Sequence, residues 1–186
     1  MDIQIFQYNE SHLGEIRIIL NEYLSFIAKE LTRPPWNFNL DIEHEVNFTM
    51  NNLDKFAEPD GRYLLVEVDG EIVGTISLRK IREDAGEIKR MYVNPKFRGK
   101  KLGNLLIEEV IEISKGNEFS KLYLDTAHFM SSAISLYKKY GFKETTAYPE
   151  SVLPKGLMNS MIFMMKELLL SCPLEPTPSS PVSNSN

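Results

Sequence analysis

Apolar residues recur at every third or fourth position between residues 10 and 31. This spacing predicts an amphipathic helix with one apolar stripe. Leu13, Ile16 and Leu20 begin the stripe, and Ser11 precedes it as the expected N-cap. Elsewhere apolar and polar residues alternate over short runs bounded by Gly, Pro, Asn or Asp, which is typical of strands. The chain therefore mixes helices and strands along its length.

The order of these elements predicts a mixed sheet. Asp69-Gly70 tolerates the positive φ of a tight turn, so the runs on either side form a hairpin. A helix separates the runs 86–93 and 121–126, so these two strands should be parallel. The expected strands are 3–6, 62–68, 71–79, 86–93, 121–126, 142–148 and 160–167. The expected helices are 10–31, 41–52, 103–114 and 133–140, the last capped by Ser131 or Ser132. A polar link is expected over 81–85 and a loop over 149–159. Their order is β-α-α-β-β-β-α-β-α-β-β.

The strand expected over 86–93 changes phase along its length. Ile88 has one parity, whereas Met91 and Val93 have the other. One extra residue in the strand, a β-bulge, would bring all three side chains to the same face. Bulges often lie beside active sites, so this strand is a candidate for one edge of a functional site.

Composition bounds the class of protein. A chain of 186 residues with 42% apolar content suits one compact domain over residues 1–170. Residues 171–186 are rich in Pro and Ser and predict a flexible tail. The net charge of −5 disfavours nucleic acid as a partner and slightly favours cationic substrates. A single cysteine, Cys172, and the absence of a signal peptide or a membrane span predict a soluble cytoplasmic protein.

The segment from Arg98 to Asn104 carries the strongest chemical signal. It follows a predicted strand, contains two glycines and three basic residues, and opens a predicted helix. Backbone N–H groups at a helix N-terminus point outward and bind anions, and the helix dipole adds partial positive charge. Arg98, Lys100 and Lys101 add full charges. The segment therefore predicts a site for a phosphate or pyrophosphate, and with it an enzyme or a cofactor-binding protein.

Three segments in order resemble the GNAT superfamily of N-acetyltransferases. Arg98-x-x-Lys101-x-Gly103 resembles the family's pyrophosphate loop, the segment 122–126 its next strand, and the segment 133–142 its Ala-Ile-x-Leu-Tyr-x-Lys-x-Gly-Phe motif. Together these matches cover about residues 61–167. The resemblance implies a mixed, mostly antiparallel sheet with one splayed parallel pair and helices on both faces. The family's middle glycine is Lys101 here. A lysine can hold the loop if its φ is negative, and its ammonium would then help to bind the anion.

The resemblance implies transfer of an acetyl group from acetyl-CoA to a primary amine, by direct attack in a ternary complex and with no metal. Tyr137 would return a proton to the departing thiolate, although an amphipathic helix also places tyrosines in cores. Glu87 is the candidate general base, with a plain strand-end carboxylate as the alternative. Glu83, Asp84 and Asp125 are weaker candidates, and Asp125 could simply satisfy a strand end. The amide of Val93 or a neighbour would hold the oxyanion.

The residues expected to contact the coenzyme, as the resemblance implies, are Met91, Tyr92, Val93, Arg98, Gly99, Lys100, Lys101, Leu102, Gly103, Asn104, Thr126, Ser132 and Tyr137. Met91 and Val93 would receive the pantetheine arm as if it were an added strand.

Other residues carry weaker signals. His128 follows a predicted strand and could move protons or could be an ordinary solvated imidazole. Trp36 and Phe38 could line an acceptor pocket or pack in the core. His12 and His44 have no partners at metal-ligand spacing.

Two other functions remain open. One is a noncatalytic acyl-CoA sensor on the same scaffold, and the other is an interaction or nucleic-acid adaptor with a basic surface loop. The sequence specifies neither the amine acceptor, small molecule or peptide, nor the oligomeric state, although homodimers are common in this family.

Overall fold

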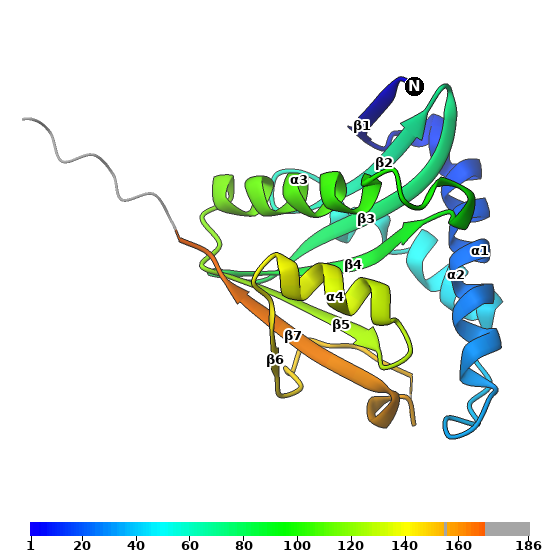
Figure 1. The fold of residues 1–186 in the computed structure, drawn as a ribbon. Coiled ribbons are helices and arrows are strands. Elements are labelled where there is room, and N and C mark those ends of the chain that lie inside the picture. Colours follow the sequence, from blue (N-terminus) through cyan, green and yellow to red (C-terminus); the bar gives the residue numbers. More distant parts are fainter. Residues whose placement is uncertain (155, 170–186) are drawn as a thin grey trace, which may run out of the picture.

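One twisted sheet separates two layers of helices (Figure 1). The computed structural model describes residues 1–154 and 156–169. In that part of the chain, seven strands pair in the order β1-β2-β3-β4-β5-β7-β6. The β4–β5 pair is parallel and every other pair is antiparallel. The predicted element order and the predicted mixed sheet with one parallel pair are therefore confirmed.

The bounds of the strands are β1 Ile3–Gln7, β2 Arg62–Val68, β3 Glu71–Arg82, β4 Ala85–Val93, β5 Lys121–Ala127, β6 Lys143–Thr145 and β7 Met161–Glu167. The α-helices are α1 Leu13–Leu31, α2 Ile42–Met50, α3 Leu102–Gly116 and α4 Ser131–Lys139. No helix within the described ranges is long and apolar enough to cross a membrane.

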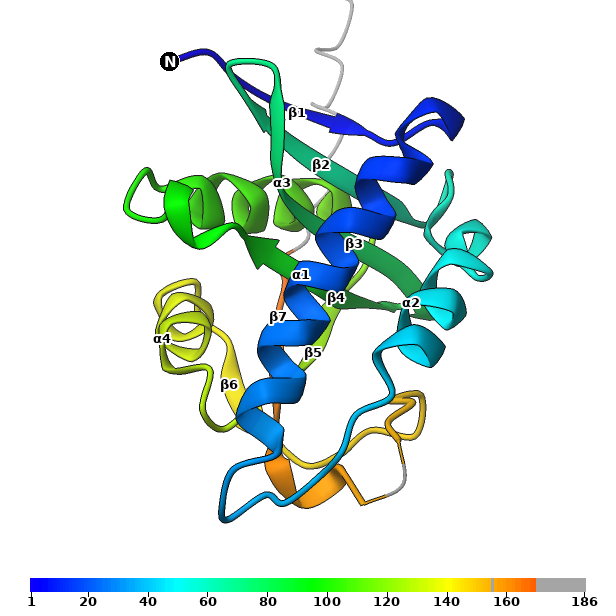
Figure 2. The same ribbon diagram turned by 90° about the vertical axis from the view of Figure 1, so that its right-hand side faces the viewer.

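Strand β2 shows why both faces of the sheet are covered. Its residues are apolar almost without interruption, and successive side chains point to opposite faces. Tyr63 and Leu65 pack in the cluster under α1 and α2, whereas Leu64 and Val66 pack in the cluster under α3. Figure 2 shows α1 crossing in front of the sheet, whereas α3 and α4 lie toward the left of the view. The sheet is therefore the middle layer of three.

The parallel strands β4 and β5 separate partway along their length. Their pairing runs from Ala85 and Lys121 to Ile88 and Leu124 and includes no later residue of either strand. At this point β4 carries the predicted bulge: Ser77 of β3 pairs with Lys89, but Thr75 pairs with Tyr92. Four β4 residues thus span what three β3 residues span. Within the described part of the chain, the edge of β4 that faces β5 has no paired strand beyond Ile88.

Three local predictions were wrong: the N-caps of two helices and the link expected over 81–85. Asn9, and not Ser11, caps the turn before α1, because its Oδ1 accepts the Ser11 N–H at 2.9 Å. Neither Ser131 nor Ser132 caps α4, whose N-cap is Met130 with no side-chain hydrogen bond. The link over 81–85 is a tight hairpin turn, since pairing of Arg82 with Ala85 satisfies backbone groups that a loop would leave open.

The strand predicted over 142–148 is shorter than expected. Only Lys143–Thr145 pairs with β7, and the chain then turns so that Tyr148 packs, almost fully buried, beside β4 and β5. The predicted tail over 171–186 lies outside the described residues, and its structure and the domain limits based on it remain predictions.

Candidate active site

The loop between β4 and α3 turns through two left-handed residues. Asn94 caps a short turn by accepting the Lys96 N–H at 3.0 Å, and the chain then passes through Arg98 in extended conformation. Gly99 has φ +81 and Lys101 has φ +62. Backbone turns of this kind direct successive N–H groups to one side, as in anion-binding nests. The loop therefore has the backbone shape that the sequence predicts for an anion site.

The free amides of this loop are fewer than the predicted range. The Arg98 N–H already donates to the Pro95 carbonyl at 3.3 Å, and the Asn104 N–H donates to the Lys101 carbonyl at 2.9 Å. Among the described residues, no backbone carbonyl accepts from an amide between Gly99 and Gly103. The backbone donors that remain for an anion are therefore those of Gly99–Gly103.

Lys101 does not have the negative φ on which the sequence interpretation depended. Its φ of 62° and ψ of 13° are left-handed helical, the conformation that glycine adopts freely and a lysine adopts at a cost. The condition under which a lysine would hold this loop without strain, a negative φ, is therefore not met. Lys101 instead holds the conformation that a glycine would adopt freely.

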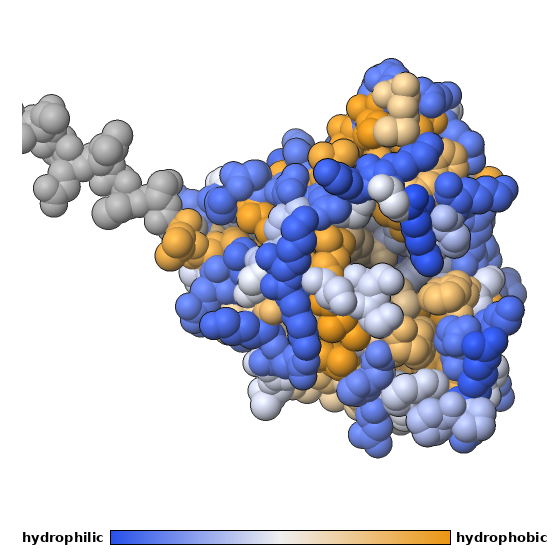
Figure 3. Space-filling model, viewed as in Figure 1, coloured by the Kyte–Doolittle hydropathy of each residue, from blue (hydrophilic) through white to orange (hydrophobic). Residues whose placement is uncertain are grey.

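Side chains fix the position of the loop against α4. Asn104 Oδ1 accepts hydrogen bonds from Lys139 Nζ at 2.6 Å and from the Tyr140 hydroxyl at 3.1 Å. A Cβ on Gly103 would lie 3.2 Å from Leu136 Cδ2, so this glycine lets the two helices approach. In the space-filling view, apolar residues are exposed in a hollow between α3 and α4 (Figure 3).

A small cavity of about 20 Å³ lies where β4 and β5 diverge. It is lined by Tyr137 from α4, Met91 from β4 and Thr126 from β5, among others. Tyr137 is 5% exposed. Burial raises the pKa of its phenol well above the usual value, and nearby Tyr23 and Asp125 raise it further. The phenol therefore stays protonated at neutral pH and can donate a proton.

A larger cavity of about 370 Å³ adjoins the small one on the α1 and α2 side of the sheet. The two cavities share the lining residues Tyr23, Lys89, Arg90, Asp125, Thr126 and Met130. Most of the remaining lining of the large cavity comes from α1, from α2 and the turn after it, and from residues between Val152 and Met161 that follow β6; Arg79 of β3 contributes as well. An extended ligand between β4 and β5 would thus place one end beside a space large enough for a second small molecule.

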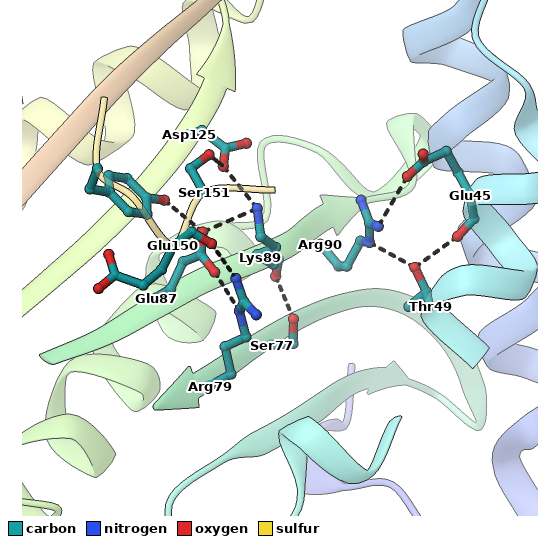
Figure 4. Close-up of polar contacts among 11 residues, drawn as sticks. Glu45, Thr49, Ser77, Arg79, Glu87, Lys89, Arg90, Asp125, Glu150 and Ser151 are labelled. Atoms are coloured by element: carbon teal, nitrogen blue, oxygen red, sulfur yellow. Dashed lines mark hydrogen bonds and ion pairs between the residues drawn. The ribbon is translucent and has the colours of Figure 1, made fainter. Parts of the chain in front are cut away.

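A network of buried charges lies between these cavities and the segment after β6 (Figure 4). Glu87 is fully buried and accepts from Arg79 Nε at 2.5 Å and from the Tyr148 hydroxyl at 2.7 Å. Lys89 Nζ lies 3.1 Å from Glu87 and 2.8 Å from Asp125. The Asp125 carboxylate also accepts from Ser151 Oγ at 3.1 Å. Burial, and then the Glu87 charge, raise the pKa of Tyr148, which keeps its hydroxyl a donor.

The geometry does not favour Glu87 as the general base. Three donors occupy its carboxylate, and it lines neither of the cavities described. A base must come within hydrogen-bond reach of the proton that it removes. Asp125, the weaker sequence candidate, lines both cavities.

Of the remaining predicted residues, some line the cavity beside Tyr137 and others lie outside it. Thr126 and Met91 line the cavity beside Tyr137, whereas Ser132 is exposed on the first turn of α4. Tyr92 turns the other way and packs its ring 5.5 Å from that of Tyr23. Trp36 stacks on the exposed His128 at 5.7 Å, and neither ring lines the described cavities, so these two residues pair with each other outside the site.

Sequence reasoning missed four contributors to the site. Arg90, Lys89 and Tyr148 gave no signal of their own, because their partners are 36 to 61 positions away in the sequence. Tyr23 follows Leu20 at a three-residue step in the apolar stripe predicted over 10–31, so its position indicates packing and gives no sign of a site residue. The one available signal for Lys89 and Arg90 was the predicted bulge, since it changes the face to which neighbouring side chains point.

The fold and site define a class of protein. Open amides at a helix N-terminus, an unpaired strand edge and a buried phenol in line beside a large cavity suit an enzyme that binds a phosphorylated carrier with an extended arm. Residues 24–142 match the model of the Acetyltransferase (GNAT) family. The chain belongs to this family, and it is an N-acetyltransferase.

Individual relatives agree with this assignment. An uncharacterized N-acetyltransferase of Schizosaccharomyces pombe is 30% identical over 158 residues, which cover 84% of this chain and 88% of the relative. The paia N-acetyltransferase of Thermoplasma acidophilum, solved in complex with coenzyme A, has a TM-score of 0.71 at 21% identity, covering 90% of this chain and 100% of that one. The yncA acetyltransferase of Salmonella typhimurium, solved with acetyl-CoA, has a TM-score of 0.64 at 18% identity, covering 96% and 100%. Both solved structures share the fold.

Proposed function

We propose that this N-acetyltransferase uses acetyl-CoA and transfers its acetyl group directly to a primary amine in a ternary complex. The observation that carries the proposal is the alignment of three features. Open amides at Gly99–Gly103 suit the pyrophosphate, the free edge of β4 beyond Ile88 suits the pantetheine arm, and Tyr137 lies beside that edge. Two of the solved relatives contain coenzyme A or acetyl-CoA, which supports the same carrier here.

The chemistry follows from these positions. The neutral amine attacks the thioester carbon from the large cavity, and an amide of the bulged strand at Val93 or a neighbour stabilises the oxyanion. The C–N bond forms as the amine adds to give the tetrahedral intermediate, and the C–S bond breaks as that intermediate collapses. Tyr137 then gives its proton to the departing thiolate, a role for which its raised pKa suits it.

The amine must lose a proton before it attacks, since an alkylammonium has a pKa of about 10.4. We propose that Asp125, directly or through water, accepts this proton, because its carboxylate lines both cavities. Glu87 then acts as a positioning residue, holding Lys89 and Arg79 under the cavity. The proposed general base is therefore Asp125 of β5, instead of the predicted Glu87 of β4.

Release of free thiol from acetyl-CoA, measured against a panel of amines, tests this proposal. An N-acetyltransferase should release thiol in proportion to an added amine, and mass spectrometry should find that amine heavier by one acetyl group. A chain that binds coenzyme A but releases no thiol with any amine would instead be the noncatalytic sensor. A chain that shows no thermal shift with coenzyme A would contradict both.

A further inference from the structure

The bulge in β4 places two consecutive cationic side chains on one face. In a regular strand Lys89 and Arg90 would point to opposite sides of the sheet. Here Arg90 has φ +54, and both side chains line both cavities. Met91, the next residue, packs on the α3 side. The bulge thus directs an additional positive charge toward the acceptor cavity at the point nearest the separated strands.

Of these cations, Arg90 has the most unused hydrogen-bonding capacity. Lys89 is paired with two carboxylates, at 2.8 and 3.1 Å. Arg90 lies 3.5 Å from Glu45 through one terminal nitrogen, and its Nε donates to the Thr49 hydroxyl at 3.0 Å (Figure 4). A guanidinium has five N–H donors, so most of those on Arg90 remain for a ligand. Thr49 is buried and holds the guanidinium in place by its Nε edge.

The whole wall of the cavity is mostly apolar, with a small excess of positive charge. Apolar side chains come from α1, α2 and the segment after β6: Leu24, Ile27, Phe48, Val152, Leu157 and Met161. Among the described lining residues, four are Lys or Arg and two are carboxylates, and the buried Glu87 behind the lining pairs with Arg79 and Lys89. Four cations thus face three carboxylates, in contrast to the net charge of −5 for the whole chain. Such a wall suits an anion joined to an apolar group.

We infer that the acetyl acceptor is an α-amino acid with an apolar side chain, and that Arg90 binds its carboxylate. The inference rests on the proposed function and names its substrate class. A carboxylate on Arg90 leaves the α-nitrogen one carbon away, at the junction with the small cavity where the thioester would lie. Guanidinium and carboxylate form two parallel hydrogen bonds, which fixes the direction of that nitrogen. The apolar side chain then occupies the wall under Phe48 and Leu157.

The proton balance of the reaction is complete with these residues. The ammonium of the amino acid loses one proton to Asp125 before attack, the C–N bond forms as the nitrogen adds to the thioester carbon, and the C–S bond breaks when the tetrahedral intermediate collapses. The nitrogen loses its second proton when the amide forms. One proton passes to sulfur through Tyr137 and the other to solvent.

A comparison of matched acceptors tests the inference. Phenylalanine and phenethylamine differ only in the carboxylate, and leucine and 3-methylbutylamine form a second such pair. The measured quantity is the ratio of kcat/KM for the amino acid to kcat/KM for its amine, each at a pH where the same fraction is unprotonated. A charge-assisted hydrogen bond to the carboxylate should make this ratio about 10 to 100 in the unmodified enzyme.

Removal of the Arg90 guanidinium and removal of the Glu45 carboxylate should move this ratio in opposite directions. Arg90→Gln should bring it close to one, and Arg90→Lys should restore part of it. Glu45→Gln removes the carboxylate that competes for the guanidinium, so it should raise the ratio severalfold. Arg17→Gln is the matched control, because it removes an arginine that links α1 to α2 outside the cavity lining, and it should leave the ratio unchanged. A thermal shift with coenzyme A confirms that each variant is folded.

The possible outcomes separate this inference from the proposed function. Thiol release with equal kcat/KM for both members of each pair, or an unchanged ratio in Arg90→Gln, overturns the inference and leaves the acetyltransferase assignment intact. A polyamine such as spermidine acetylated better than either amino acid overturns it as well. Failure of all amines to release thiol overturns the proposed function and the inference together.

Discussion

Lys101 is one of five described non-glycine residues with a positive φ. It holds a left-handed conformation at the N-cap of α3, which costs a non-glycine residue about 1–2 kcal/mol. Lys101→Gly should therefore raise the free energy of unfolding by about 1 kcal/mol, a shift of about 2–4 °C in Tm for a chain of this length. Thermal denaturation measures the change.

Lys100→Gly provides the control for this substitution. It removes the same charge from the neighbouring position, which is not among the positive-φ residues, so it should leave Tm unchanged or lower it slightly. Equal effects of the two substitutions would mean that the charge, and not the backbone, sets the stability of the loop.

Tyr137 should matter to the rate and not to the binding of coenzyme. A general acid contributes about 10²–10⁴ in rate, so Tyr137→Phe should lower kcat at least a hundredfold while coenzyme A still raises Tm. Because burial raises the pKa of this phenol, the protonated acid persists to high pH. The rate should therefore rise with pH as the amine loses its proton, and it should show no descending limb up to about pH 10, the ordinary pKa of tyrosine.

Tyr23→Phe is the comparison at the same cavity. Tyr23 is a second buried phenol with a raised pKa, and burial is the main cause. If Tyr23→Phe loses the activity and Tyr137→Phe keeps it, the acid has been assigned to the wrong helix. The sequence identified Tyr137 through a local motif. It could not identify the contribution of Arg90, because the residues that hold its guanidinium lie on α2, more than 40 positions earlier.

At the scale of elements, the start of α3 and the separated strands β4 and β5 together form the proposed coenzyme site. Gly103 lies on the first turn of α3, where a side chain would enter the space between Met91 and Leu136. Gly103→Glu adds bulk and negative charge beside the open amides and should abolish coenzyme binding. At a hundredfold excess over Kd, coenzyme A should stabilise the unmodified chain by about 2.7 kcal/mol, a shift of several degrees in Tm.

Gly14→Glu is the matched control for this prediction. It places the same residue on the first turn of α1, where no atom lies within 4 Å of the new Cβ. The coenzyme-dependent shift should be absent in Gly103→Glu and intact in Gly14→Glu. A full shift in Gly103→Glu would show that the coenzyme binds elsewhere.

The segment after β6 depends on a side chain that no local pattern predicts to be buried. Tyr148 donates to Glu87 across 61 positions of sequence and helps to satisfy a carboxylate with no exposed surface. Tyr148→Phe leaves that carboxylate with one donor fewer and should lower the free energy of unfolding by about 1–3 kcal/mol. Urea denaturation measures it. Tyr123→Phe, whose ring packs 4.9 Å away, should cost less, and an equal cost would indicate packing rather than the hydrogen bond.

These elements also show which features of the fold could be predicted from the sequence and which could not. The bulge in β4 followed from a change of parity between Ile88 and Met91, and both residues do pack in the cluster under α3. The strand predicted over 142–148 was too long, because its later residues satisfy Glu87 instead of β7. The alternation of apolar and polar residues predicts which face of a sheet a side chain occupies. It does not predict which side chain of another strand forms a hydrogen bond with it.

For the whole molecule, the order of elements predicted the three layers. The large cavity was not predictable, because it is assembled from α1, α2, β4, β5 and the segment up to Met161. No stretch of sequence contains it. The described residues of the site all lie before residue 162, and β7 ends at Glu167. Removal of residues 171–186 should therefore leave kcat/KM within about twofold, and a large loss would show that the tail takes part in the reaction.

A crystal structure with coenzyme A bound tests the central claim most directly. The account predicts the pyrophosphate on the amides of Gly99–Gly103, the pantetheine arm along β4 beyond Ile88, and the sulfur within reach of the Tyr137 hydroxyl. A coenzyme bound elsewhere, or a pyrophosphate excluded from the loop by the Lys101 side chain, would contradict it.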